Sequence, residues 1–225
     1  FEVLKDADYV HHLAALVSVP ESILKPEECF DINVNGTINI LDAAKEFGVK
    51  KVVLSSSAAV YGDNPESPKR INMQPQPKTP YATTKLEGEK LLQEYHEKYE
   101  LGTISLRYFN VYGPRQDVNN PYAAVIPRFI NSILSGKDPV IYGDGRQTRD
   151  FTFVEDVVRA NILCCNSSQN TGGEVYNIAG GRRISILNLL ELLCNIMGKK
   201  VKPVFVEPRK GEIRDSEASV KKAYD

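Results

Sequence analysis

The 225-residue chain lacks several features that would assign it to a specialised class of protein. It has no apolar run of about 18 residues, which argues against a transmembrane helix, and no signal-peptide pattern at its start. Its net charge is −1, so composition gives no electrostatic reason to expect binding to nucleic acid or to a membrane surface. With 42% hydrophobic and 25% charged residues, it is typical of a soluble globular protein of one large or two modest domains.

Cysteine is also scarce, and its spacing is not that of a metal site. The cysteines are Cys29, Cys164, Cys165 and Cys194. Two of them are adjacent in an apolar helical stretch, so we interpret them as buried thiols of a cytoplasmic protein. His11 and His12 lie on an apolar segment and are interpreted as core histidines. The sequence therefore predicts no bound metal.

Strand-like and helix-like segments alternate along the chain with short breaks, which is typical of βαβ units and a parallel sheet. In the first half we expect strands at 8–14, 51–54 and 103–107 and helices at 26–48 and 81–99. In the second half we expect helices at 123–134, 155–166 and 185–197 and strands at 140–142, 150–154, 175–179 and 201–206. The predicted fold class is α/β, a doubly wound parallel sheet of Rossmann type with a smaller C-terminal α/β substrate domain.

The sequence pattern changes near residue 111, and we place the boundary between the two domains there. Residues 1–111 form the Rossmann-like domain and residues 112–225 form mainly the second domain. Strands near 151–154 and 175–179 are expected to return to the first sheet. Residues 63–80 are rich in Pro, Lys and Asn, and we expect a loop that borders a site.

The segments Ser55-Ser-Ser57 and Tyr81-Ala-Thr-Thr-Lys85 together hold the groups needed to remove a proton from a hydroxyl. Ligands of open parallel sheets bind at the carboxyl ends of strands, where the serines lie. Tyr81 and Lys85 are four residues apart, so they share one face of the predicted helix. A nearby lysine favours the phenolate of a tyrosine, which makes it a usable base, and Ser57 could orient the proton. The Tyr-x3-Lys spacing is common by chance, so its context carries the interpretation.

That context resembles the extended short-chain dehydrogenase/reductase superfamily, and within it the nucleotide-sugar 4-epimerases, especially the bacterial UDP-N-acetylglucosamine 4-epimerases. The motifs occur in the family's order and run nearly end to end. They are His12-Leu-Ala-Ala15, Asn33-Val-Asn-Gly-Thr37, Ser55-Ser-Ser57-Ala-Ala-Val-Tyr-Gly62, Tyr81-Ala-Thr-Thr-Lys85, Arg107-Tyr-Phe-Asn110-Val-Tyr-Gly-Pro114, Asp144-Gly-Arg-Gln-Thr-Arg149-Asp150 and Gly211-Glu-Ile-Arg214.

The resemblance implies NAD as cofactor and a UDP-hexose as substrate. Tyr81 is then the catalytic base, Lys85 lowers its pKa and holds the nicotinamide ribose, and Ser57 is the hydroxyl partner. The residues implied to contact the cofactor are Leu13, Ala14, Ala15, Asn33, Ser57, Tyr81, Lys85 and Phe109. Those implied to contact the substrate are Asn110, Gln116, Ala124, Val125, Val140, Tyr142, Arg149, Arg209, Glu212, Arg214 and Ser216. The implied reaction is a transient oxidation at C4 of the sugar, with no net redox change and with NAD tightly retained.

One departure concerns the cofactor phosphates. Family members begin with a strand and a Gly-x-x-Gly-x-x-Gly turn that receives the pyrophosphate, and this chain contains no such turn. We therefore expect a Rossmann-like domain without its first βαβ part, and the sequence leaves NAD and NADP undistinguished. The resemblance also implies a homodimer through a four-helix bundle made by helices 26–48 and 81–99, with Leu91, Leu92 and Tyr95 as candidate contacts.

Other activities share the fold. Nucleotide-sugar 4,6-dehydratases carry an Asp-Glu pair directly after the hydroxyl residue, and UDP-glucuronate decarboxylases place a Glu there. Here these positions are Ala58 and Ala59, whose methyl groups cannot move protons. A non-catalytic dinucleotide-binding regulator is a further alternative, disfavoured because Ser57, Tyr81 and Lys85 are all present.

The choice of sugar is expected to depend on a few small side chains. In the family, the position of Ser216 borders the 2-position of the sugar, where a small residue admits an N-acetyl group. Gln116 and Ala124 also match the epimerases that use N-acetylated sugars, whereas Val17 and Ala58 do not match the strictly selective members. Use of UDP-glucose and UDP-galactose therefore stays open.

Overall fold

The computed structural model describes residues 2–117, 124–168, 172–208 and 213–225. Its centre is a four-stranded parallel sheet in the order β1-β2-β3-β8, made by Tyr9–His12, Lys51–Ser57, Gly102–Tyr108 and Glu174–Ile178. The first six residues of β2 are buried. Such continuous burial is typical of a parallel strand covered on both faces. The predicted parallel α/β sheet is therefore confirmed.

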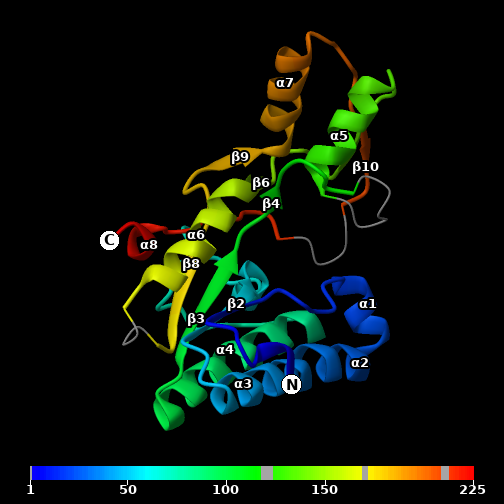
Figure 1. Ribbon diagram of the computed structural model, residues 1–225. Coiled ribbons are helices and arrows are strands. Elements are labelled where there is room, and N and C mark those ends of the chain that lie inside the picture. The colour runs from blue at the N-terminus through cyan, green and yellow to red at the C-terminus, as the bar shows by residue number, and fades with distance from the viewer. Residues whose placement is uncertain (1, 118–123, 169–171, 209–212) are drawn as a thin grey trace.

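Helices cover both faces of this sheet (Figure 1). On one face lie α3 (Gly36–Glu46) and α4 (Pro80–Tyr99), which pack with Val52 and Leu54 of β2. On the other face lies α6 (Val154–Asn166), which packs with Val53. Successive strand residues point to opposite faces, so the run Val52-Val-Leu54 supplies both cores.

The helix α4 begins and ends where its sequence dictates. The Thr79 side chain accepts a hydrogen bond from the backbone N–H of Ala82, and Pro80 occupies the first turn. Glu100 ends the helix in the left-handed conformation. Gly88 allows close packing, because a Cβ there would lie 3.0 Å from Cδ2 of Leu54 on β2. The prediction of a helix at 81–99 is confirmed.

The predicted helix at 26–48 is broken into three parts. The α-helices α2 (Pro26–Phe30) and α3 are joined by a π-helical turn, η2 (Asp31–Asn35). A π turn inserts an extra residue into a helix and often occurs at functional sites. The hydrophobic spacing of the sequence gave no sign of it.

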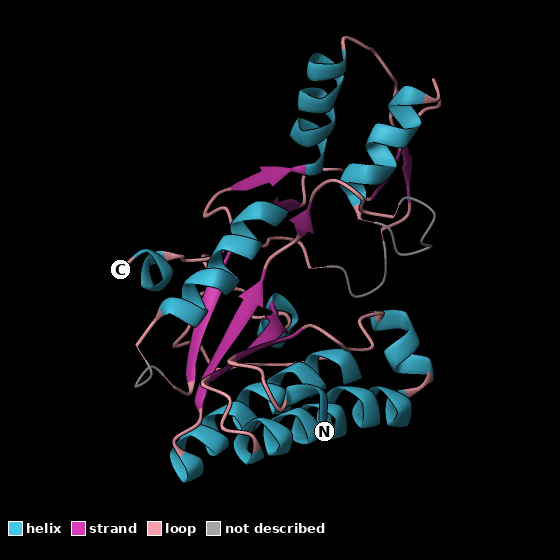
Figure 2. Ribbon diagram, in the orientation of Figure 1, coloured by secondary structure: helices cyan, strands magenta, loops and turns pink. Residues whose placement is uncertain are grey.

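A second, smaller group of elements lies beyond the carboxyl ends of the main strands (Figure 2). It contains α5 (Val125–Leu134), α7 (Ile186–Met197), the parallel pair β5 (Val140–Tyr142) and β10 (Val204–Val206), and the antiparallel pair β6 (Thr148–Asp150) and β9 (Arg183–Ser185). Ser185 caps α7, and Gly198 ends it in the left-handed conformation. Ile126, Phe129 and Leu189 belong to its core.

Of the two late strands, only β8 joins the main sheet. The segment near 151–154 instead forms β7 (Thr152–Phe153), which pairs with β4 (Val111–Tyr112) in a separate ladder. The short elements that were not predicted include the strands β4 and β9, the 3-10 helices η1 (Glu2–Leu4) and η3 (Ala58–Tyr61), and the α-helices α1 (Val19–Leu24) and α8 (Lys221–Tyr224). None of the described helices is long and apolar enough to span a membrane.

The expected burial of the cysteines and histidines holds only in part. Cys29 and Cys164 are buried, whereas Cys165 and Cys194 are partly exposed. His12 is buried, whereas His11 is exposed because β1 is an edge strand of the described sheet.

A buried ion pair fixes α4 to the sheet. The Arg107 guanidinium on β3 donates two hydrogen bonds to the Glu89 carboxylate on α4, with N–O distances of 2.9 and 2.7 Å. Both side chains are 5% exposed, and the Ser56 hydroxyl also donates to Glu89. Removing one partner of such a pair leaves a buried charge uncompensated, which costs more than the pair itself contributes.

We therefore expect Glu89→Ala to lower the free energy of unfolding by about 3 to 5 kcal/mol. Urea denaturation followed by circular dichroism measures this. Glu87→Ala is the matched control, because Glu87 pairs at the surface of the same helix with Lys90 and is expected to change stability little. A loss below about 1 kcal/mol for Glu89→Ala would show that the pair does not anchor the helix.

Candidate active site

The predicted catalytic residues meet at the carboxyl ends of β2 and β3, as expected for an open parallel sheet. Ser57 is the last residue of β2, and Phe109 and Asn110 follow β3. They line a cavity of about 400 Å³, here named the Tyr81 cavity. The predicted site residues that line it are Ser57, Tyr81, Phe109, Asn110, Arg149 and Ser216.

Lys85 lies behind Tyr81, one helical turn further along α4. Its ammonium is buried and donates a 2.8 Å hydrogen bond to the carbonyl oxygen of Ser55. The same nitrogen lies 5.8 Å from the centroid of the Tyr81 ring. The spacing of four residues thus places both side chains on the face of α4 that meets the end of β2.

Burial shapes the acid–base properties of this group. Burial raises the pKa of Tyr81, and a hydrogen bond with Ser57 lowers it again. Burial lowers the pKa of Lys85 to about 8, so the ammonium is still mostly protonated at neutral pH. A cation so close to the ring favours the phenolate form of Tyr81.

The loop at 63–80 borders the cavity, as the sequence predicted. Asp63, Lys69, Lys78 and Thr79 contribute to the lining. Gly62 makes this path possible, because its φ is +55° and a Cβ there would lie 1.9 Å from the carbonyl oxygen of Gln76. The backbone N–H of Gln76 donates to the carbonyl oxygen of Val60, which holds the loop against η3.

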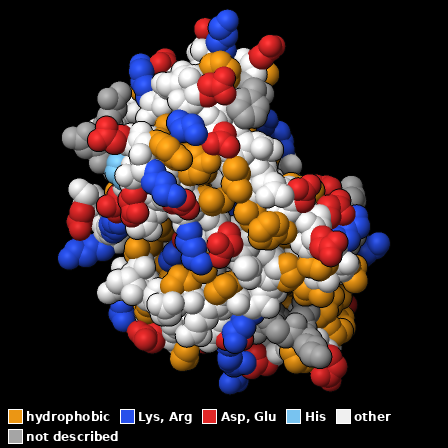
Figure 3. Space-filling view, turned by 90° about the horizontal axis from the view of Figure 1, so that it is seen from below, with side chains coloured by type: hydrophobic (Ala, Val, Ile, Leu, Met, Phe, Trp, Pro, Cys, Tyr) orange, Lys and Arg blue, Asp and Glu red, His pale blue; other side chains and the backbone are white. Residues whose placement is uncertain are grey.

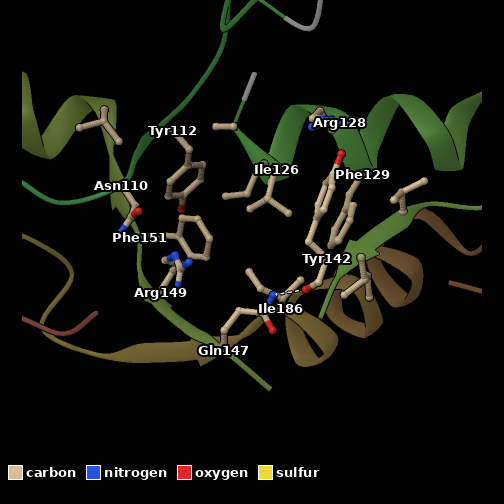
Figure 4. Close-up of a pocket in the computed structure, with 15 residues that line it drawn as sticks. Asn110, Tyr112, Ile126, Arg128, Phe129, Tyr142, Gln147, Arg149, Phe151 and Ile186 are labelled. Carbon is tan, nitrogen blue, oxygen red and sulfur yellow. Dashed lines mark hydrogen bonds between the residues drawn. The ribbon is translucent and has the colours of Figure 1, made fainter. Parts of the chain in front are cut away.

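A second cavity of about 300 Å³ lies in the smaller group of elements and is named the Tyr142 cavity (Figure 4). Tyr142 and Phe129 lie on one side of it, while Tyr112 and Phe151 lie on the other. The rings of Tyr112 and Phe151 meet edge to face at 6.2 Å. Among the predicted substrate residues, those lining it are Asn110, Ala124, Val125, Val140, Tyr142 and Arg149.

Asn110 and Arg149 line both cavities and so connect them. The Asn110 amide donates to the carbonyl oxygen of Asp150 at 2.9 Å and to the Ser216 hydroxyl at 3.4 Å. Asn110 adopts a φ of +29°, a conformation that asparagine tolerates better than most residues. A ligand spanning both cavities would pass beside one amide and one guanidinium.

The structure does not bring all predicted residues to a cavity. Gln116 lies outside both, and its amide nitrogen donates to the carbonyl oxygen of Val111. Arg214 is exposed and pairs with Asp144 at 3.1 Å. Ala124 lines the Tyr142 cavity and not the Tyr81 cavity, where we expected it to border the sugar. Arg209 and Glu212 lie outside the described residues.

The predicted cofactor residues fall into two groups. Leu13 and Ala14 are exposed directly after β1, at the same edge of the sheet as Ser57, and Ala15 is partly exposed. Asn33 is only 4% exposed, and both its amide oxygen and its amide nitrogen form hydrogen bonds within the chain. Asn33 is therefore buried, and its side chain is engaged by groups of the chain itself.

Several residues that line the two cavities were not predicted from the sequence. Arg128 lies 6.0 Å from the centroid of the Tyr142 ring, and Gln147 donates to the carbonyl oxygen of Tyr142 at 2.6 Å. Val19 and Tyr108 line the Tyr81 cavity. The amphipathic pattern of 123–134 could have pointed to Arg128, as a cation on an otherwise apolar face. No group of three or more potential metal ligands occurs among the residues described.

Residues 1–179 match the model of the NAD dependent epimerase/dehydratase family. A putative UDP-glucose 4-epimerase of Methanocaldococcus jannaschii is 38% identical over 97% of this chain and 70% of its own length. A UDP-N-acetyl-alpha-D-glucosaminuronate decarboxylase of Bacillus cytotoxicus is 40% identical over 82% of this chain and 58% of its own length.

Solved structures are similar over nearly the whole chain. The UDP-N-acetylglucosamine 4-epimerase of Methanobrevibacter ruminantium, in complex with UDP-N-acetylmuramic acid, matches with a TM-score of 0.95 and 43% identity. That match covers 99% of this chain and 71% of the other. The UDP-glucuronic acid 4-epimerase of Bacillus cereus, in complex with UDP-glucuronic acid and NAD, matches with a TM-score of 0.89 and 35% identity, over 99% of this chain and 69% of the other.

The chain spans about two thirds of the length of these relatives, from 58 to 71%. Within that span the parallel sheet and the family model agree. This chain belongs to the NAD dependent epimerase/dehydratase family, and its relatives include UDP-glucose and UDP-N-acetylglucosamine 4-epimerases.

Proposed function

We propose that the chain carries the catalytic and sugar-nucleotide-binding residues of a UDP-hexose 4-epimerase. The observation that carries this proposal is the composition of the Tyr81 cavity. Tyr81 and Ser57 open into it, while the neighbouring positions of the lining are the methyl groups of Ala58 and Ala59. The cavity thus contains a base, but the two positions lack the acid pair that would drive elimination of water.

The residues at this edge of the sheet fit the nicotinamide end of NAD, the cofactor of the family. Lys85 and Tyr81 offer an ammonium and a phenol that suit ribose hydroxyls, and the small side chains of Ala14 and Ala15 leave room beside the end of β1. When bound, NAD supplies a reversible hydride acceptor for the sugar carbon. We expect it to be retained rather than exchanged, since epimerisation involves no net redox change.

In the proposed mechanism, the Tyr81 phenolate takes the proton of the 4-hydroxyl group as C4 becomes a ketone. Ser57 orients that proton through its hydrogen bond to Tyr81, and the Lys85 ammonium stabilises the phenolate. When C4 is reduced again from the other face of the carbonyl, Tyr81 returns the proton to the oxygen at C4, which completes the inversion. The 4-keto sugar has to turn over between these events, so the nucleotide and not the sugar must be held firmly.

The Tyr142 cavity is suited to hold the nucleotide. Its aromatic walls offer a stacking surface for a uracil ring, with Tyr142 and Phe129 labelled on one side in Figure 4. Arg149 lies where the two cavities meet, and a planar guanidinium pairs well with phosphate oxygens. We therefore place the diphosphate near Asn110 and Arg149, with the sugar in the Tyr81 cavity.

Dehydration and decarboxylation remain the rival reactions, because one relative is named as a decarboxylase. Two carboxylates do line the Tyr81 cavity, Asp63 and Asp215. Asp215 accepts a hydrogen bond from the Thr148 hydroxyl at 2.6 Å and lies 3.7 Å from Arg183, so it is already engaged. NMR of the product separates the reactions: an inverted C4 supports epimerisation, whereas a C6 methyl group or a pentose supports a rival.

A non-catalytic dinucleotide-binding regulator is the alternative from another functional class. It would bind NAD and a UDP-sugar without converting either. The complete set of Ser57, Tyr81 and Lys85 favours an enzyme.

We also expect a homodimer through α3 and α4, which form the lower surface in Figure 1 and carry apolar side chains among charged ones in Figure 3. Tyr95 on α4 donates to Asp42 on α3 at 2.9 Å, which holds the two helices side by side. Leu91 and Tyr95 are partly buried, whereas Leu92 is 1% exposed and belongs to the core. Leu92 was therefore wrongly expected to contact a partner.

The first prediction concerns the base. Tyr81→Phe in the full-length protein should keep the fold and NAD binding but lower turnover of UDP-sugars by about 10² to 10⁴-fold, because the proton acceptor is removed. Steady-state epimerisation, with circular dichroism and NAD content as folding and binding checks, measures this. Turnover within about threefold of the wild type would remove Tyr81 from the mechanism.

The second prediction concerns the sugar. Ser216 lines the Tyr81 cavity, so a small side chain there leaves space for an acetamide group. We expect the wild type to accept UDP-N-acetylglucosamine and Ser216→Tyr to abolish that activity while sparing UDP-glucose, because steric exclusion discriminates more steeply than one added contact. Ser216→Ala, which stays small, is the control and should retain both activities. Equal loss of both sugars in Ser216→Tyr would contradict this assignment.

A further inference from the structure

Behind Tyr81 lies a group of buried polar side chains that the mechanism above does not use. Ser22, Asn33 and Thr84 are 0, 4 and 2% exposed and come from α1, η2 and α4. Buried polar side chains need partners, and all three have them within the chain. Their partners lead to the backbone of the catalytic tyrosine.

Asn33 is the centre of this group. Its amide oxygen accepts a 2.7 Å hydrogen bond from the backbone N–H of Leu16, and its amide nitrogen donates to the Leu16 carbonyl oxygen at 3.1 Å. Asn33 thus forms hydrogen bonds with both the N–H and the carbonyl group of Leu16, in the loop that follows β1. The π turn places Asn33 at the junction of α2 and α3, where its side chain also reaches α4.

A continuous hydrogen-bonded path runs from Asn33 to Tyr81. The Asn33 amide donates to the Thr84 hydroxyl at 2.9 Å, and that hydroxyl donates to the carbonyl oxygen of Tyr81 at 2.9 Å. On the other side, the backbone N–H of Tyr81 donates to the Ser22 hydroxyl at 3.2 Å. Tyr81 stands in the first turn of α4, where backbone N–H groups have no partner within the helix.

We propose that Ser22, Asn33 and Thr84 are positioning residues that couple the loop after β1 to the catalytic tyrosine. They hold the Tyr81 backbone from both sides and fix it relative to Leu16. The inference rests on the proposed function, which assigns Ala14 and Ala15 of that loop to the cofactor. These hydrogen bonds, here named the brace, keep the loop after β1 and the base Tyr81 in one position relative to each other.

The expected consequence of breaking the brace is misplacement of the phenol. A displacement of about 1 Å in an active site can cost 10²-fold in rate. Moving Tyr81 away from Ser57 would also weaken the hydrogen bond that lowers the pKa of Tyr81. The pKa of the base would then rise, so the acidic limb of the pH–rate profile would move to higher pH.

Thr84→Val tests the brace, because valine keeps the shape of the side chain and removes the hydroxyl. We expect kcat to fall by roughly ten- to a hundredfold, with KM for the UDP-sugar within about twofold and the acidic limb of kcat shifted to higher pH. Thr84→Ser restores the hydroxyl and should recover most of kcat. Thr83→Val is the matched control, since Thr83 is the exposed neighbour on the same helix and should behave like the wild type.

A merely structural role gives a different result. It would lower the urea midpoint of Thr84→Val while leaving kcat and the pH profile of the folded protein unchanged, which would overturn the proposal. An equal loss in Thr83→Val, or no recovery in Thr84→Ser, would overturn it as well. If Thr84→Val does not fold, Ser22→Ala removes the other contact to Tyr81 and is assessed by the same criteria.

A direct measurement of the pKa of the Tyr81 phenol distinguishes failure of this proposal from failure of the proposed function. Tyrosine labelled with ¹³C at Cζ reports its pKa by NMR in the full-length protein, with Tyr81→Phe identifying the signal. If the wild type converts no UDP-sugar, a raised pKa of Tyr81 in Thr84→Val still supports the brace. An unchanged pKa overturns it, whatever the activity.

Discussion

The Lys85 ammonium is buried at the end of the sheet and donates to the carbonyl oxygen of Ser55. This contact joins α4 to the last residues of β2, and it places Tyr81, one turn earlier on α4, beside Ser57. It also keeps a cation near a phenol in a setting where burial alone would raise the pKa of Tyr81 and lower that of Lys85. The buried Glu89–Arg107 pair, one turn further along the helix, anchors the same packing.

The fold was predictable where sequence pattern and burial coincide. The run Val52-Val-Leu54 is buried on both faces, which is typical of a covered parallel strand. Ser185 and Gly198 are of residue types that mark helix ends through local hydrogen bonding or backbone conformation, and the structure has both at the ends of α7. The candidate base and its lysine were indicated by helical spacing and strand position, and the resemblance of the surrounding motifs to the family carried the interpretation.

Other features depend on contacts between distant segments, and the sequence did not reveal them. The π turn at Asp31–Asn35 is stabilised by the hydrogen bonds of Asn33 to Leu16 and Thr84, which no local pattern encodes. Segment 151–154 looks like a strand of the main sheet, but it pairs with β4 after the chain has left that sheet. Gln116 and Arg214 have the right residue types for a substrate site, yet their side chains bond to Val111 and Asp144.

The central claim is that one base in the Tyr81 cavity supports oxidation and reduction at the same sugar carbon. The most direct test is conversion of UDP-N-acetylglucosamine carrying deuterium at C4, in ordinary water, by the full-length protein with NAD. The account predicts the C4 epimer with its deuterium retained at C4, because the hydrogen that leaves this carbon returns to it. Replacement of the deuterium by solvent hydrogen, or a product changed at C6 instead of C4, would contradict the account.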